Sequence, residues 1–291
     1  MPQIITLEAG TYQLSVTDAN GCAILGETEI IEPEPIDFKV LNVQNVTCNG
    51  DATGAITLEA LGGTPPFAYR VAGENFQNDP VLASLSAGDY TLEVRDNRGC
   101  VQAVSTRVAE PEAFFVDAGT DVTIELGDNT RLDAVPNPLS LDVTYQWMPA
   151  ETLSCTDCPN PTASPFQNTT YTVTITDPTG CSVSDEVEVR VLKLRPIYIP
   201  TVFSPNGDGE NDFFTLFGGK SAKLIRLLRI YSRWGELMFE TSNIPLSIED
   251  LGWNGLLNNE ILPPSVFAFY AEVEFIDNEV IIYEGDISLI R

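Results

Sequence analysis

The sequence contains no histidine. Histidine is the commonest general base and the commonest transition-metal ligand in proteins. Catalytic arrangements of the Ser-His-Asp or Cys-His type are therefore excluded for these 291 residues. Paired carboxylates carry no signal either, because 42 acidic residues bring many carboxylates close together in sequence. We expect a protein that binds its partners and catalyses no reaction.

Basic residues are scarce. Lys and Arg number 15 against 42 Asp and Glu, a net charge of −27. The excess lies upstream: residues 1–193 carry 8 basic and 28 acidic side chains, and residues 194–291 carry 7 and 14. A field of this sign repels nucleic acids and anionic membrane surfaces. The simplest interpretation is a solvated surface protein.

Long apolar runs are absent too, so the sequence predicts no transmembrane helix. The N-terminus, M-P-Q-I-I-T-L, lacks the charged and apolar regions of a signal peptide, and we expect the chain to be a piece of a longer exported one. The 21 Gly and 20 Pro, with frequent Thr and Val, indicate many short strands and turns. The predicted fold class is all-β.

An internal repeat organises the first two thirds of the chain. Residues 10–22, G-T-Y-Q-L-S-V-T-D-A-N-G-C, recur at residues 88–100 as G-D-Y-T-L-E-V-R-D-N-R-G-C. A looser copy, Y-T-V-T-I-T-D-P-T-G-C, occupies residues 171–181. Alternating Tyr, Leu and Val predict a half-buried strand, which the Asp and Gly end in a turn. Three copies indicate tandem sandwich modules, immunoglobulin-like by analogy.

The second copy is complete. It also contains V-T-C-N-G-D-A-T-G-A-I-T-L at residues 46–58 and G-G-T-P-P-F-A-Y-R at residues 62–70. These stretches resemble the SprB-type repeat of large cell-surface adhesins in gliding Bacteroidetes. In the first copy Met1 aligns with Asp79, so we expect a repeat that lacks its opening half.

The last third contains four blocks in a fixed order. They are P-I-Y-I-P-T-V-F-S-P-N-G-D-G-E-N-D-F-F (196–214), I-Y-S-R-W-G-E-L-M-F-E (230–240), W-N-G (253–255) and I-S-L-I-R (287–291). Together they resemble the type B C-terminal sorting domain of the Bacteroidetes type IX secretion system. The resemblance assigns the motif to Pro205, Asn206, Gly207, Asp208, Gly209, Asn211, Asp212, Arg233, Trp234, Gly235, Trp253, Asn254 and Gly255.

Four segments follow from these patterns. Residues 1–35 are the end of a truncated SprB-like repeat, 36–111 a complete repeat, 112–193 an immunoglobulin- or PKD-like module with Trp147 in its core, and 194–291 the sorting domain. We expect tandem immunoglobulin-like β-sandwiches that end in a β-sandwich sorting domain. Only residues 223–233 are ambiguous: their apolar period fits a helix, and the family resemblance makes them a strand.

Six cysteines suggest an oxidising compartment. The preferred pairings are Cys48–Cys100 within the complete repeat and a local Cys155–Cys158 bridge. A zinc site needs four ligands, and neither a histidine nor a second C-x-x-C is present. No cofactor is required by this interpretation.

The acidic loop permits two interpretations. Asn206, Asp208, Glu210 and Asp212 alternate with other residues, as the oxygen ligands of calcium loops do. The glycine expected at the sixth position is missing, because Asn211 stands there. The other interpretation is a turn-rich loop whose side chains bond their own backbone.

Two tryptophans and three arginines complete the candidate residues. Trp234 and Trp253 either fill the core or belong to a surface that the secretion machinery recognises. Arg226, Arg229 and Arg233 are a basic cluster, although strand alternation does not place them in one stripe.

The resemblance implies a function. It implies the C-terminal region of a large secreted adhesin for gliding or attachment, exported by the type IX translocon and attached to the outer membrane through a PorP/SprF-like barrel protein. Surface glycans are the further expected partners. The alternatives are a calcium-dependent carbohydrate-binding module, revealed by a ligand or Ca²⁺ shift in melting temperature, and accessory domains of an exported enzyme whose catalytic domain lies upstream.

Overall fold

The computed structural model describes residues 4–291 as β-strands and turns, with one short 3₁₀ helix, η1 (Glu249–Leu251). The all-β prediction is confirmed. No helix within residues 4–291 has the length and apolarity needed to cross a membrane. The chain divides into two compact units between Ala113 and Phe114, and each is described by itself.

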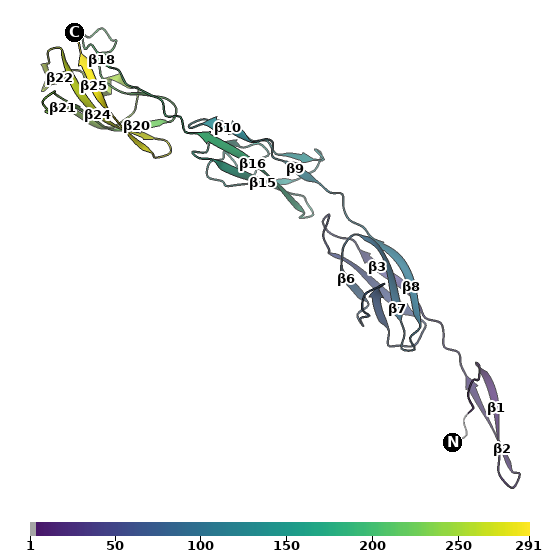
Figure 1. Cartoon of the computed structure of the whole chain (residues 1–291). Coiled ribbons are helices and arrows are strands. Elements are labelled where there is room, and N and C mark those ends of the chain that lie inside the picture. The colour runs from purple at the N-terminus through teal and green to yellow at the C-terminus, as the bar shows by residue number, and fades with distance from the viewer. Residues whose placement is uncertain (1–3) are drawn as a thin grey trace. The chain divides into compact units, whose positions relative to one another are not determined.

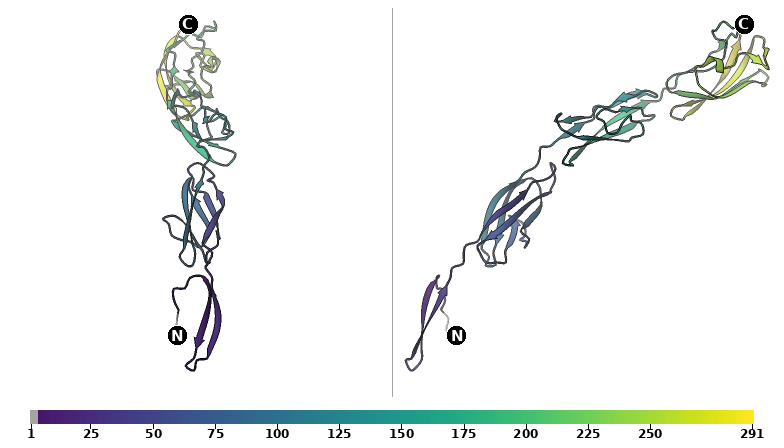
Figure 2. Two further views of the ribbon diagram at one scale, coloured as in Figure 1. Left: turned by 90° about the vertical axis from the view of Figure 1, so that its right-hand side faces the viewer. Right: turned by 180° about the vertical axis from the view of Figure 1, so that it is seen from behind.

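The first unit opens with a lone hairpin. Strands β1 (Gly10–Thr17) and β2 (Ala23–Ile30) pair antiparallel along their whole length. Figures 1 and 2 show no second layer over these two strands. Val16 of β1 is therefore 66% exposed, whereas Val94, its counterpart in the complete repeat, is 0% exposed. The same strand sequence is buried only where the other half of a repeat accompanies it.

The complete repeat is a β-sandwich of two three-stranded sheets. One sheet has the order β3-β4-β6 and the other β5-β7-β8. Alternation places Ile56 and Leu58 of one sheet against Leu92 and Val94 of the other, all of them buried. The strands are β3 (Asp37–Gln44), β4 (Gly54–Leu61), β5 (Ala68–Val71), β6 (Val81–Leu85), β7 (Gly88–Arg95) and β8 (Val101–Val108).

The second unit begins with a module whose main sheet has the order β10-β16-β15-β13. Its core contains Trp147, as predicted, together with Tyr171 and Val173 of the repeated strand. The strands are β9 (Phe115–Asp117), β10 (Val122–Glu125), β11 (Thr130–Arg131), β12 (Val135–Asn137), β13 (Thr144–Met148), β14 (Thr162–Ala163), β15 (Thr169–Thr176) and β16 (Ser182–Leu192).

Residues 194–291, here called the sorting domain, centre on a five-stranded sheet of order β18-β25-β24-β20-β21. In β24 the side chains of Phe267, Phe269, Ala271, Val273 and Phe275 alternate onto the core face. The strands are β17 (Ile197–Tyr198), β18 (Val202–Phe203), β19 (Phe217–Gly218), β20 (Ala222–Tyr231), β21 (Leu237–Ile244), β22 (Leu256–Leu257), β23 (Glu260–Ile261), β24 (Ser265–Phe275) and β25 (Val280–Leu289).

The ambiguous stretch 223–233 is confirmed as a strand over most of its length. It forms β20, which pairs with β24 on one side and β21 on the other. Its register with β24 shifts between Ile225 and Leu227, so a bulge at Arg226 places the core residues Ile225 and Leu228 three positions apart. This irregularity explains why the apolar residues of the stretch follow a helix-like spacing.

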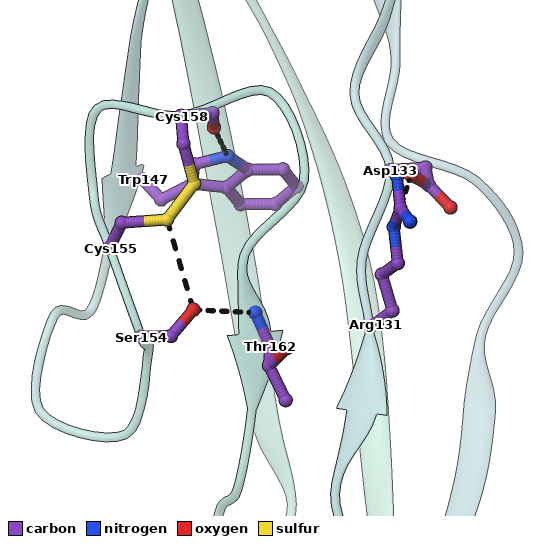
Figure 3. Close-up of a disulfide and its surroundings, with 7 residues drawn as sticks. All are labelled: Arg131, Asp133, Trp147, Ser154, Cys155, Cys158 and Thr162. Carbon is purple, nitrogen blue, oxygen red and sulfur yellow. Dashed lines mark hydrogen bonds and ion pairs between the residues drawn. A yellow bond between two sulfur atoms is a disulfide. The ribbon is translucent and has the colours of Figure 1, made fainter.

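The local disulfide Cys155–Cys158 is present, as predicted. Figure 3 shows it beside Trp147, whose indole Nε1 donates to the backbone oxygen of Cys158 at 3.0 Å. The hydroxyl of Ser154 lies 3.8 Å from the Cys155 sulfur and accepts the backbone N–H of Thr162 at 2.9 Å. The bridge thus fastens an irregular loop over the core tryptophan.

The predicted Cys48–Cys100 bridge is wrong, because Cys100 is a free, exposed thiol. Cys100 lies just before β8. The loop of Cys48 is bonded beyond the other end of β8, where the Gly50 N–H donates to the Glu110 carboxylate at 3.0 Å. The eight residues of β8 span about 25 Å. A disulfide requires α-carbons within about 7 Å of each other.

We predict that Cys100 is alkylated by iodoacetamide in the native chain without reductant, since its sulfur is exposed and unpaired. Peptide mass mapping measures the modification. Cys155 and Cys158 serve as the internal control and stay unmodified until reductant is added. Recovery of a peptide that joins Cys48 to Cys100 contradicts this prediction.

Candidate recognition surface

The acidic loop after Pro205 folds around the carboxylate of Asp212. The two oxygens of that carboxylate accept the backbone N–H groups of Gly207 at 2.7 Å and Gly209 at 2.9 Å. Both glycines have positive φ, 82° and 89°, which turns their N–H groups toward the same anion. Asp212 is therefore the centre of the loop's own fold.

Asn206 and Asp208 bond within the loop as well. The Asn206 side-chain oxygen accepts the Asp208 N–H at 2.9 Å, and the Asp208 carboxylate accepts the Glu210 N–H at 2.8 Å. That backbone bond, with a second from the Asn206 amide, holds the pKa of Asp208 below its usual value. These contacts are the backbone-bonding turns of the second interpretation. Within residues 4–291 no three His, Cys, Asp or Glu side chains are grouped to hold a metal ion, and calcium stays a prediction.

The W-N-G motif is structural. Trp253 is 0% exposed and packs with Phe203 and Phe267, at ring-centre distances of 5.3 and 4.8 Å. Its indole N–H donates to the oxygen of Leu256 at 3.0 Å. The side-chain oxygen of Asn254 accepts the Leu256 N–H at 3.2 Å, which closes the turn. The core-filling interpretation of Trp253 is confirmed.

Gly255 shows why this turn ends in glycine. Its φ is 71°, and an added β-carbon would lie 2.6 Å from the Leu289 side chain and 3.0 Å from Pro205. The lack of a side chain lets the W-N-G turn pack against the end of β25 and the base of the acidic loop. Arg291 closes the same contact, because its guanidinium donates to the Pro205 oxygen at 3.1 Å.

The R-W-G motif behaves differently. Trp234 is 86% exposed, so the core-filling interpretation is wrong for this residue. It lies in the turn between β20 and β21, beyond the last pairing of these strands. The turn is ordered: the Ser232 hydroxyl accepts the N–H groups of Trp234 at 3.3 Å and Glu236 at 3.2 Å, and Gly235 donates to the Ser232 oxygen at 2.9 Å.

All three motifs leave the sheet at one end of the sorting domain. β18 runs parallel to β25 and pairs Phe203 with Leu289. β24 begins opposite, where Ser265 also pairs with Leu289. β20 ends beside that start, where Tyr231 pairs with Ala268. We call this end, with loops 204–213, 232–236 and 252–255, the motif end.

The other end of the sheet carries the turn between β24 and β25. Asp277 in this turn forms ion pairs with Arg195 and with Lys193, the latter at 3.3 Å. Lys193 and Arg195, which lead into the sorting domain, are therefore held at the end of the sheet opposite the motif end. The eleven-residue strand β24 separates the two ends by about 33 Å. The motif end is directed away from its own linker.

A hollow of about 900 Å³ adjoins Trp234 on the outer face of the sheet. The exposed side chain of Val266 contributes an apolar wall, because strand alternation turns its neighbour Phe267 into the core. Arg233 lies over the Trp234 ring, with its guanidinium carbon 5.3 Å from the ring centre. The hollow is lined by residues 231–235, 265–268 and Asp286.

The predicted arginine cluster does not act as one surface. Arg229 is paired with Glu240 at 2.6 Å across β20 and β21. Arg226 lies further along β20, away from the R-W-G turn. Only Arg233 belongs to the motif end. Strand alternation does not place the three arginines in one stripe, and the bulge in β20 further changes which side chains share a face.

The comparisons with known protein families agree with the two resemblances. Residues 197–287 match the family described as CHU_C Type IX secretion signal domain, and residues 40–73 match the SprB repeat. Both predicted families are thereby confirmed over these ranges. The comparison with curated proteins found no match.

Several solved structures resemble the chain distantly. Sidekick-1 immunoglobulin domains 1–5 align at 9% identity and a TM-score of 0.34, over 97% of this chain and 66% of that one. Drosophila N-cadherin EC1-4 aligns at 10% identity and a TM-score of 0.27, over 97% and 83%. The chain thus spans slightly less than two thirds of the Sidekick-1 structure. The assignment as β-sandwiches depends on the strand pairing described above.

A secreted, cell-surface-associated protein with a C-terminal type IX sorting signal follows from the two family matches. The match to the signal family lies within the sorting domain.

We predict that Gly255→Ala destabilises the sorting domain by roughly 3 kcal/mol, because the new methyl group meets Leu289 and the backbone keeps a left-handed conformation. Gly235→Ala is the matched control. Its φ of 84° is similar, nothing lies within 4 Å, and its cost is about 1 kcal/mol. Calorimetric unfolding measures both. Equal costs would show that Gly255 is not selected by close packing.

Proposed function

We propose that this chain is the C-terminal region of a large adhesin for gliding or attachment, in which the sorting domain is both secretion signal and outer-membrane anchor. The translocon binds the domain during export. A barrel protein of the PorP/SprF kind then holds it at the surface. The upstream sandwich modules carry the adhesive part away from the membrane.

The exposed Trp234 is the observation that supports this proposal. Burying a tryptophan stabilises a protein by about 3 kcal/mol, and this domain leaves the ring in water. An ordered turn holds the ring in place, so little conformational entropy is lost when a partner covers it. Exposed, ordered tryptophans of this kind are typical binding hot spots.

The surroundings of Trp234 indicate how a partner engages it. The hollow beside the ring offers an apolar wall at Val266 and is also bordered by Asp286. Arg233 is not among the arginines of residues 4–291 that form ion pairs. A partner segment with an apolar side chain and a carboxylate would fill the hollow and pair with Arg233. The motif end points away from Lys193 and Arg195, which lead into the sorting domain at its other end.

Binding without turnover is the proposed mode of action. The motif residues divide between structure and contact: Asp212, Trp253 and Gly255 build the motif end, and Arg233 and Trp234 meet the partner. No metal ion is needed for either task in this scheme.

We predict that deleting Pro196–Arg291 retains the protein inside the cell, because the recognised domain is lost. Cell fractionation and immunoblotting of the medium and the cell surface measure the distribution. Normal export of the truncated chain would contradict the assignment of the sorting domain as the signal.

We predict that Trp234→Ala weakens capture of the barrel protein at least tenfold, while the domain stays folded because the side chain is 86% exposed. The measurement is a pull-down from Bacteroidetes outer membranes with residues 194–291 fused to a fluorescent protein, followed by mass spectrometry. Tyr198→Ala is the control, since Tyr198 is also an exposed aromatic residue but lies in β17. Equal capture by both variants would remove Trp234 from the binding surface.

A further inference from the structure

A hollow of about 420 Å³ lies in the complete repeat, beside the turn that joins β7 to β8. Two arginines, Arg95 and Arg98, and two amides, Asn78 and Asn97, line it. The ring of Phe67 with Pro66 and Ala68 forms the apolar part of the wall. Such a mixture of a few polar groups and an apolar wall is typical of ligand sites.

The two arginines are unpaired in a chain rich in acids. Nine of the 15 lysines and arginines form ion pairs with carboxylates of residues 4–291. Neither Arg95 nor Arg98 is among them. With 42 carboxylates in the sequence, two neighbouring guanidinium groups that keep their donors free require an explanation.

The fold of the turn does not provide that explanation. The same turn occurs three times in this chain. Asp96 accepts the N–H groups of residues 98 and 100, as Asp18 accepts those of 20 and 22, and Asp177 those of 179 and 181. The positions of Arg95 and Arg98 are Thr17 and Asn20 in the first copy and Thr176 and Thr179 in the third. The turn therefore forms equally well without arginine.

Arg95 is also held in position. Its guanidinium carbon lies 4.1 Å from the centre of the Phe76 ring, and Arg70 covers the same ring at 4.2 Å. Arg70 donates hydrogen bonds to the carboxylate of Glu93 and to the backbone oxygen of Glu74. Stacking thus fixes the plane of Arg95 and leaves its N–H groups directed to solvent and the hollow.

We propose that this hollow binds the carboxylate of an acidic sugar residue, such as a uronic acid in a surface polysaccharide. Arg95 and Arg98 bind the carboxylate, the amides of Asn78 and Asn97 bind ring hydroxyls, and the C–H face of the sugar packs on Phe67. The site lies in the repeat and is independent of the sorting domain, so its test and that of the proposed export function are separate.

Asp96 also borders the hollow, and its carboxylate already accepts hydrogen bonds from backbone N–H groups. Burial acts to raise the pKa of Asp96, and hydrogen bonds from the backbone N–H groups of Cys100, Thr64 and Arg98 outweigh it and lower the pKa. The charge of Arg98 lowers the pKa of Asp96 further, so this carboxylate attracts Arg98 across the turn, and the turn's own backbone donors occupy its oxygens.

The test is isothermal titration calorimetry of the full chain with tetragalacturonate, using a neutral tetrasaccharide of glucose as the comparison. We expect binding of the acidic oligosaccharide alone, weakened by added salt. The variant Arg95→Thr with Arg98→Asn carries the residues of the first copy and should lose at least tenfold in affinity, with the melting temperature lowered only slightly by the loss of the Arg95–Phe76 contact. Arg107→Thr is the control, because it removes an unpaired arginine on β8 outside the hollow.

A second variant, Arg95→Lys with Arg98→Lys, keeps both charges and removes the forked donors. It should also lose affinity, by severalfold. Affinity unchanged in this variant, or reduced equally by Arg107→Thr, would overturn the site. Binding of inorganic phosphate as tight as that of monomeric galacturonate would overturn the sugar assignment, since a general anion site needs no apolar wall.

Discussion

The motif end of the sorting domain depends on the packing of one indole ring. Trp253 lies between Phe203 of β18 and Phe267 of β24, and through them it joins the acidic loop, the W-N-G turn and the end of β25. Phe214, which follows the acidic loop, exchanges two backbone hydrogen bonds with Trp253. Without this ring, the acidic loop and the W-N-G turn would have no common core at their base.

This core explains why some motif residues stabilise the fold and others remain exposed for contact with a partner. Asp212 organises the acidic loop from within, and Gly255 permits the close approach of that loop to β25. The side chains of Arg233 and Trp234 do not hold their turn together, because the Ser232 hydroxyl binds the backbone N–H groups that close it. The motif blocks thus contain two kinds of residue: buried ones that stabilise the fold of the motif end, and exposed ones that are available to a partner. The sequence does not distinguish them, and their burial in the structure does.

The three copies of the strand-turn-Cys sequence illustrate the same point in the upstream modules. The aspartate of each copy makes the same turn, whereas the flanking residues differ in charge. One scaffold therefore carries arginines in one copy and neutral side chains in the other two. If the hollow of the complete repeat binds an acidic sugar, a longer array of such repeats would gain avidity by presenting many weak sites together.

Alternation, turn residues and repeat spacing sufficed to predict the all-β class, the strand 223–233 with its family resemblance, the local Cys155–Cys158 bridge and the core position of Trp147. These features depend on neighbours in sequence, where the period of a strand and a three-residue separation limit the geometry. The free state of Cys100, the exposure of Trp234 and the position of residues 66–68 and Asn78 beside Arg95 and Arg98 depend on strand direction and on which end of a sheet a loop leaves. Those are long-range properties, because a strand of eight residues separates its two ends by about 25 Å whatever its composition.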